Sequence, residues 1–120
     1  MKSFVFKFTG KEIEYFDNLA KGLGIRKGVL ISHPSKWLER KMKNNEPYEL
    51  DFEDDSHKYT NPLLSHTVAI DDETKKLLKT EADILGVTRY QLVRALIKKV
   101  PELIMNNEFY DDSVEELKYK

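Results

Sequence analysis

In two stretches of the chain, large apolar residues alternate with polar or smaller ones. Phenylalanine occupies positions 4, 6 and 8 of the first stretch, and in the second a valine at 68 and an isoleucine at 70 alternate with Thr67 and Ala69. A period of two residues is typical of a strand that buries one face. The sequence therefore predicts two short strands, one beginning at Ser3 and the other at Ser65.

Each predicted strand runs directly into a helical pattern. Thr9 and Asp71 follow the strands, and both residue types commonly cap a helix N-terminus. Thr9 together with Glu12 also matches a capping box. Each helical pattern ends at a glycine, Gly24 or Gly86, which is a frequent C-terminal signal. The apolar positions between these ends are Ile13, Phe16, Ala20 and Leu23 in the first pattern and Leu78, Ala82 and Leu85 in the second.

A further helical pattern follows each of the two glycines. In the C-terminal half of the chain it ends in front of Pro101, which we expect to stop the helix. In the N-terminal half Pro34 falls inside the pattern, and we expect it to kink the helix or to delay its start to about Ser32 or Ser35. The apolar residues of the last helix are Leu92, Val93, Leu96, Ile97 and Val100.

The two strand, helix, helix patterns are copies of each other. Residues 3–32 align without a gap with residues 65–94, at a constant offset of 62 between residue 3 and residue 65. A strand on its own is unstable in water, and even a lone hairpin is marginal. The repeat therefore predicts that the strand of one copy pairs antiparallel with the strand of the other.

This tandem pattern, with "IDDETKKLL" at the second strand–helix junction, resembles the ribbon-helix-helix family of Arc-, MetJ- and CopG-like DNA-binding proteins. Within that family it is similar to the TraY relaxosome proteins of conjugative plasmids. The resemblance covers residues 3–42 and 65–100. It implies an α+β fold, mostly α, in which tandem ribbon-helix-helix repeats form an intramolecular pseudo-dimer with one two-stranded antiparallel ribbon and four main helices.

Charge is distributed unevenly among four expected segments. The net charge is +6 over residues 1–43, −5 over 44–63, +2 over 64–100 and −4 over 101–120. Basic blocks beside acidic appendages are typical of a nucleic-acid surface, and also of solvated helix faces next to an ordinary loop. The expected segments are a first ribbon-helix-helix unit over 1–43, an acidic linker over 44–63, a second unit over 64–101 and an acidic C-terminal tail over 102–120.

Composition narrows the class of protein. The chain has 120 residues, 40% apolar and 34% charged, which suits one domain or two very small ones with a modest core. The absence of cysteine excludes disulfides and thiolate metal sites and fits a reducing compartment. Since no apolar stretch reaches the roughly 18 residues of a membrane span and the N-terminus lacks a signal-peptide core, we expect a soluble, cytoplasmic protein.

The outward positions of the predicted ribbon are candidates for reading DNA bases. A two-stranded ribbon fits the major groove of duplex DNA, where Lys7 could donate to guanine, Thr67 and the serines could serve several bases, and Val5 and Ala69 could contact a thymine methyl. The set contains no Arg, Asn or Gln, so a merely solvated ribbon face is the alternative. The predicted base-reading residues are Ser3, Val5, Lys7, Ser65, Thr67 and Ala69.

The N-terminus of the second helix in each unit is a candidate phosphate site. Its free amides and the positive end of the helix dipole favour an anion there. Thr88 is a good N-cap residue and Arg26 is not, although Arg26 adds charge. Ordinary basic residues at a turn are the alternative. The predicted phosphate-binding residues are Arg26, Lys27 and Gly28 in the first unit and Thr88, Arg89 and Tyr90 in the second.

No catalytic, metal or cofactor pattern is recognisable. His33, His57 and His66 do not form the i, i+4 histidine pair with a carboxylate that zinc enzymes use. At position 66 a buried, hydrogen-bonded or edge-exposed histidine is expected rather than a ligand. A glycine-rich phosphate loop and a nucleophile elbow are likewise missing from the sequence, so we expect neither an enzyme nor a cofactor or metal.

These observations predict a protein that acts by binding alone. We expect a sequence-specific binder of double-stranded DNA, either a transcriptional repressor or, as the TraY resemblance implies, a relaxosome accessory factor, with cooperative self-association on DNA as an option. The alternative is a protein-binding module on the same scaffold, of an antitoxin-like or phage-inhibitor kind. The acidic linker and tail, which carry spaced aromatics, could dock on a protein partner, cover the chain's own basic surface or simply aid solubility.

Overall fold

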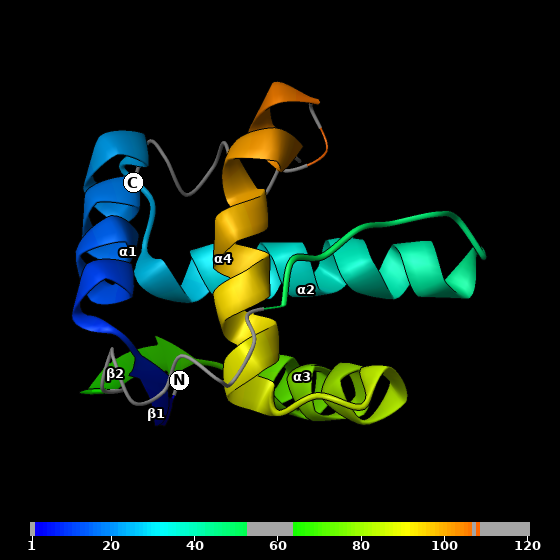
Figure 1. Ribbon diagram of the computed structural model, residues 1–120, viewed down its shortest axis with the longest axis horizontal. Helices are drawn as coiled ribbons and strands as arrows, with labels where there is room; N and C mark the ends of the chain where they lie inside the picture. The colour runs from blue at the N-terminus through cyan, green and yellow to red at the C-terminus, as the bar shows by residue number, and fades with distance from the viewer. Residues whose placement is uncertain (1, 53–63, 107, 109–120) are drawn as a thin grey trace.

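A mostly helical α+β fold with one small sheet is the architecture of this chain (Figure 1). The computed structural model describes residues 2–52, 64–106 and 108. Within this described part, no helix is long and apolar enough to cross a membrane. The elements are β1 (Lys2–Phe8), α1 (Gly10–Leu23), α2 (Lys27–Lys43), β2 (Leu64–Ile70), α3 (Asp72–Leu85) and α4 (Arg89–Met105).

The two strands pair antiparallel, which confirms the predicted pairing between the two copies of the repeat. The register runs from Lys2 opposite Ile70 to Phe8 opposite Leu64, so each strand begins one residue before its predicted start. Alternate side chains divide between two faces, as the period of two requires. The inner face is buried and contributes Phe6, Phe8, Val68 and Ile70 to the core.

The helix ends follow the predicted capping signals. The Thr9 hydroxyl accepts a hydrogen bond from the amide of Glu12 at 3.2 Å, and the Thr9 amide donates to the Glu12 carboxylate at 2.8 Å. This reciprocal pair is the capping box that the sequence predicts for α1. Helices α1 and α3 both end at a glycine in the left-handed region, with φ of 64° at Gly24 and 71° at Gly86.

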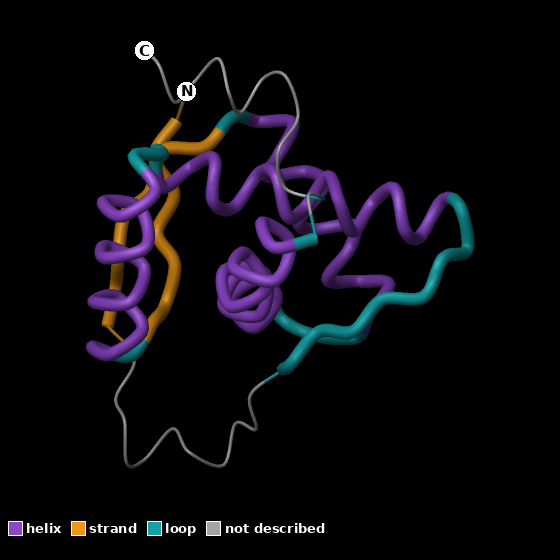
Figure 2. The backbone as a smooth tube through the Cα atoms, turned by 90° about the horizontal axis from the view of Figure 1, so that it is seen from above, coloured by secondary structure: helices purple, strands orange, loops and turns teal. Residues whose placement is uncertain are grey.

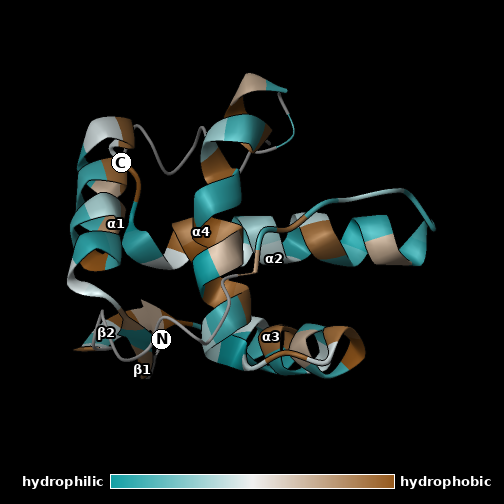
Figure 3. Ribbon diagram, in the orientation of Figure 1, coloured by the Kyte–Doolittle hydropathy of each residue, from teal (hydrophilic) through white to brown (hydrophobic). Residues whose placement is uncertain are grey.

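The core lies where the four helices meet the inner face of the ribbon. The ribbon and α1 lie together at one end of the molecule, and α4 passes through its centre (Figure 2). Helices α2 and α3 pack against each other and extend away from the ribbon (Figure 1). Hydrophobic residues recur along these helices, separated by hydrophilic ones (Figure 3). Fully buried members include Phe16, Leu30, Leu38, Leu78, Leu92 and Leu96.

A carboxyl group is buried in this core. Glu81 of α3 is only 1% exposed and accepts a hydrogen bond of 2.6 Å from the hydroxyl of Ser35, which is itself fully buried on α2. Burial raises the pKa of Glu81 from 4.5 to about 8, although the Ser35 hydrogen bond lowers it and the charge of nearby Glu39 raises it further. The carboxyl group is therefore protonated in the folded protein at neutral pH.

The expected delay of α2 by Pro34 and the expected stop of α4 at Pro101 were wrong, whereas a kink at Pro34 stays a prediction. Helix α2 begins at Lys27 and continues through Pro34, so its start is not delayed to Ser32 or Ser35. Helix α4 likewise continues through Pro101 to Met105. A proline inside a helix removes one hydrogen bond, but apolar burial on both sides of it can hold the helix together. Leu30 and Leu38 on α2, and Leu103 on α4, are buried to at least 99%.

The chain after α2 is packed rather than separate from the core. From Asn45 the backbone turns back along α2 toward α4 (Figure 1). Tyr48, Leu50 and Phe52 are partly buried against the hydrophobic core. The described part of the expected acidic linker therefore covers the core, and its remaining residues, 53–63, lie outside the described residues.

The expected acidic tail also begins inside the packed structure. Its residues 102–105 belong to α4, which places the predicted unit boundary after residue 101 within a helix. Beyond the helix, the Trp37 indole donates a hydrogen bond of 2.7 Å to the carboxylate of Glu108, which also pairs with Lys41. The Trp37 hydrogen bond, followed by the Lys41 interactions, lowers the pKa of Glu108. Residues 107 and 109–120 of the tail lie outside the described residues.

Candidate nucleic-acid interface

The outer face of the ribbon is open to solvent. Of the six predicted base-reading residues, five are exposed: Ser3, Val5, Ser65, Thr67 and Ala69. Val5 keeps 49% of its surface exposed although it lies at the middle of a strand. Because these side chains are exposed, no described helix packs on this face. The structure thus brings these residues together on one accessible surface.

Lys7 is the exception among the predicted base-reading residues. It is half-buried, and its ammonium group donates a hydrogen bond of 2.6 Å to the hydroxyl of Ser65, the residue directly opposite it in the ribbon. This pair is the kind of cross-strand contact that stabilises antiparallel sheets. Lys7 would therefore have to exchange Ser65 for another acceptor before it could contact a base.

The N-terminus of α2 lies beside β2 and carries two very different cations. Arg26 is exposed at the N-cap, and within the described structure its side chain makes no capping hydrogen bond. Lys27 points the other way: its ammonium group pairs with the Asp17 carboxylate and lies 3.1 Å from Nε2 of His66. It also lies 5.6 Å from the centre of the Phe16 ring. Lys27 is therefore engaged by α1 and β2 rather than directed at the surface.

The same cluster sets the protonation of its neighbours. The hydrogen bond from Lys27 holds the pKa of Asp17 below its usual value. Burial, followed by the positive charge of Lys27, lowers the pKa of His66. A neutral His66 can accept a hydrogen bond from the Lys27 ammonium. Of the buried, hydrogen-bonded and edge-exposed environments expected for the histidine at position 66, the structure has the hydrogen-bonded one.

Gly28 has a steric role that the sequence did not reveal. A Cβ atom at this position would lie 2.2 Å from the backbone carbonyl oxygen of Ala69. The first turn of α2 therefore approaches the backbone of β2 as closely as only glycine allows. Gly28 therefore allows the close approach of helix and ribbon. Its amide is one of those in the first turn of α2 that have no partner within the helix.

The N-terminus of α4 is capped more completely. The Thr88 hydroxyl accepts from the amide of Gln91 at 3.1 Å, and the Thr88 amide donates to the Gln91 side chain at 2.9 Å. Arg89 is exposed at the first helical residue. The ring of Tyr90 is half-buried and packs edge-on against Phe6, with ring centres 6.4 Å apart. Thr88 and Tyr90 are thus mainly structural, whereas Arg89 faces solvent.

A groove of about 650 Å3 lies between α2 and β2, and it adds basic residues that sequence reasoning missed. Besides Arg26, it is lined by His33 and Lys36 from the next two turns of α2. Arg26, His33 and Lys36 recur at the spacing of residues on one face of a helix, so this spacing in the sequence could have identified them. Next to β1, the ammonium group of Lys75 on α3 lies 4.3 Å from the centre of the Phe4 ring.

The described residues contain no group of three or more His, Cys, Asp or Glu side chains that could hold a metal ion. No family model, curated protein or solved structure matches the chain. Its interpretation therefore rests on the geometry of the ribbon and of the two helix N-termini beside it.

Proposed function

We propose that this protein binds double-stranded DNA sequence-specifically, with the ribbon in the major groove, and that it acts by binding alone as a transcriptional repressor or relaxosome accessory factor. The observation that carries the proposal is the ribbon itself. One of its faces is buried against the helices, while the other exposes five short side chains of the kind that reach base edges.

The register supports a pseudo-dimer of two ribbon-helix-helix units. Val5 pairs with Thr67 at the centre of the ribbon, and these two residues also occupy equivalent positions in the two copies of the repeat. The strands are 7 residues each, α1 and α3 are 14 each, and α2 and α4 are 17 each. A local two-fold axis through the central pair would place the two halves on equivalent DNA half-sites.

Two arginines supply the phosphate contacts in this proposal. Arg26 and Arg89 are exposed at the starts of α2 and α4, where the helix dipole and free amides favour an anion. Lys27 and Gly28 act indirectly, since one is paired internally and the other spaces the helix from the ribbon. The proposal therefore assigns phosphate contact to fewer residues than the sequence predicted.

The two halves of the DNA site should differ. The exposed residues Ser3 and Val5 of β1 correspond in the repeat to Ser65 and Thr67 of β2. A homodimer presents identical halves to a palindrome, whereas this chain presents a valine on one strand and a threonine on the other. Exchanging the central pair, with Val5→Thr and Thr67→Val together, should move the base preference between the half-sites.

The experiment is selection of duplex DNA from a random pool, followed by affinity measurements at several salt concentrations. Thr67→Val, which replaces the hydroxyl by a methyl group of similar size, should cost about 1–3 kcal/mol on the selected site and little on random DNA. Arg89→Ala should weaken binding to both DNAs and lower the salt slope by about one. Lys43→Ala is the matched control, because Lys43 is exposed at the far end of α2 (Figure 1).

Failure to enrich any sequence, or equal losses for Lys43→Ala and Arg89→Ala, would contradict the proposal. A protein-binding module is the second candidate, and the exposed Val5 on a face without Arg, Asn or Gln among its described residues favours it. That candidate predicts that Val5→Ser abolishes the activity in the cell although no duplex DNA is selected.

A further inference from the structure

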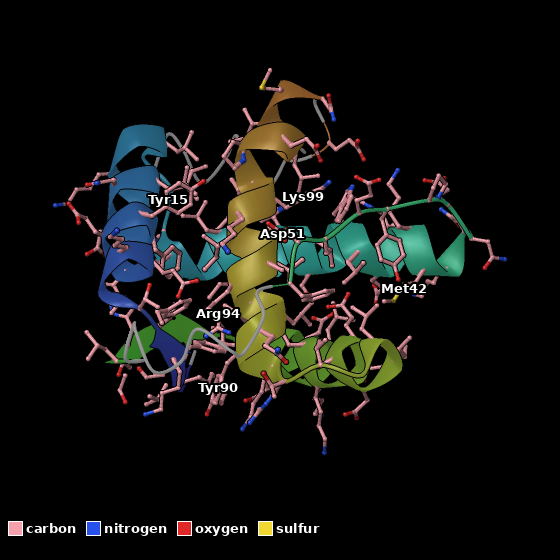
Figure 4. All side chains as sticks on the ribbon, viewed as in Figure 1. Tyr15, Met42, Asp51, Tyr90, Arg94 and Lys99 are labelled. Carbon is pink, nitrogen blue, oxygen red and sulfur yellow. The ribbon has the colours of Figure 1, made fainter. Side chains whose placement is uncertain are left out.

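A cavity of about 420 Å3 lies between α1 and α4, and the proposed DNA contacts do not use it. Tyr15 of α1 and Arg94 of α4 face this space from opposite sides (Figure 4). Phe8, at the end of β1, joins them. The complete lining is Phe8, Lys11, Glu12, Tyr15, Arg94, Ile97 and Lys98, which combines apolar walls with three cations and one anion.

Two buried polar atoms of the cavity, one on Arg94 and one on Glu12, lack a hydrogen-bond partner among the described residues. Arg94 is only 6% exposed, and its Nε lies 3.8 Å from the Glu12 carboxylate, too far for a hydrogen bond. Among the described residues, neither Nε of Arg94 nor Oε2 of Glu12 has a hydrogen-bond partner, although both atoms are buried. Arg94 is thus ion-paired with Glu12, but its Nε–H group lacks an acceptor. Because a buried donor without an acceptor is unfavourable, a ligand that supplied an acceptor to Arg94 would be stabilised.

The equivalent positions in the other unit carry smaller, uncharged side chains. Positions 12 and 94 correspond in the repeat to Thr74 and Ser32, which belong to α3 and α2 and line the groove beside β2. Helices α2 and α3 pack directly against each other, and Thr74 is 98% buried. The charged pair of Glu12 and Arg94 therefore distinguishes the cavity between α1 and α4 from its counterpart.

We propose that this cavity binds a small aromatic anion, such as an aryl carboxylate or sulfonate. The ring would lie against Phe8, Tyr15 and Ile97, and the anionic group would accept hydrogen bonds from Arg94. Lys11 at the rim adds a further positive charge, and the volume lies within the range of about 300–1,000 Å3 usual for small-molecule sites. This site does not depend on DNA binding.

The test uses the full chain, uniformly labelled with nitrogen-15, in an NMR titration with 2-naphthoate and with the uncharged 2-naphthamide. We expect saturable 1:1 binding of naphthoate, with the largest shifts at the amides of Phe8, Tyr15 and Ile97. The amide should bind about tenfold or more weakly, because it lacks the charge that Arg94 recognises. Equal binding of the two probes, no binding, or shifts centred elsewhere would overturn the proposal.

Variants separate recognition from stability. Tyr15 is 41% exposed and Lys11 is exposed, so replacing either by alanine should leave the chain folded. Tyr15→Ala should weaken naphthoate binding by about tenfold, and Lys11→Ala should weaken it severalfold. Lys79→Ala on α3 removes an exposed lysine elsewhere and should change nothing. Arg94→Lys, checked by thermal melting, should reduce the preference for naphthoate over naphthamide. Unchanged affinity in Tyr15→Ala would show that the cavity is not the site.

Discussion

Replacing the buried carboxyl group of Glu81 by an amide should change how stability depends on pH. Glu81 is 1% exposed, accepts a hydrogen bond from Ser35 and has its pKa raised from 4.5 to about 8. Glu81→Gln keeps an oxygen that can accept from Ser35, and because the amide does not ionise, folding no longer requires the uptake of a proton at this position. We therefore expect this variant to fold and to be more stable than the wild type at neutral pH.

The sign and size follow from proton linkage. Below pH 4.5 the carboxyl is protonated in both states, so its full stabilising contribution is present. As the pH rises from 4.5 to about 8, the unfolded state ionises first, and the free energy of unfolding falls by up to about 5 kcal/mol. At pH 7 Glu81→Gln should accordingly exceed the wild type by about 3 kcal/mol.

The assay is urea unfolding of both proteins, followed by circular dichroism, at several values between pH 5 and pH 8. The lowered pKa of His66 contributes a slope of opposite sign, so the difference between the two proteins is the quantity to compare. Glu14→Gln changes an exposed carboxylate on α1 and should keep the wild-type slope. A difference that stays constant with pH would refute the assignment of a protonated, buried Glu81.

Four further substitutions test helix packing, helix capping and a partly buried hydrogen bond. Gly28→Ala should destabilise the fold by about 1–3 kcal/mol, because its Cβ would meet the Ala69 carbonyl, and thermal melting would detect this. Thr88→Ala should cost about 1 kcal/mol through loss of the α4 cap, whereas Arg26→Thr should gain a similar amount by capping α2; urea midpoints would show both. Trp37→Phe removes the indole donor to Glu108 and should cost about 1–2 kcal/mol in the same urea experiment, whereas an unchanged midpoint would show that this contact contributes nothing.

Local signals in the sequence were sufficient for much of the fold. The alternation of phenylalanines in β1 and the glycines at positions 24 and 86 depend only on neighbours along the chain, and the structure has both features as predicted. The helices that continue through Pro34 and Pro101 were not predictable in this way. Their continuation depends on burial of neighbouring leucines by other elements, which outweighs the local effect of proline.

The candidate site shows the same division between local and tertiary information. Exposure of Val5 and Thr67 follows from the period of two, so the sequence places them correctly on the outer face. The internal pairing of Lys27, by contrast, requires Asp17 of α1 and His66 of β2, which only the tertiary fold brings together. The approach of Gly28 to Ala69 is equally a contact between distant parts of the chain.

The placement of both ribbon strands on one chain has a consequence for dilute solutions. When two separate chains share a ribbon, lowering the protein concentration favours dissociation and therefore unfolding. Here β1 and β2 are covalently connected, so their encounter is intramolecular and its effective concentration does not change on dilution. The ribbon should persist at a few molecules per cell, and each strand is free to accumulate substitutions that its counterpart does not share.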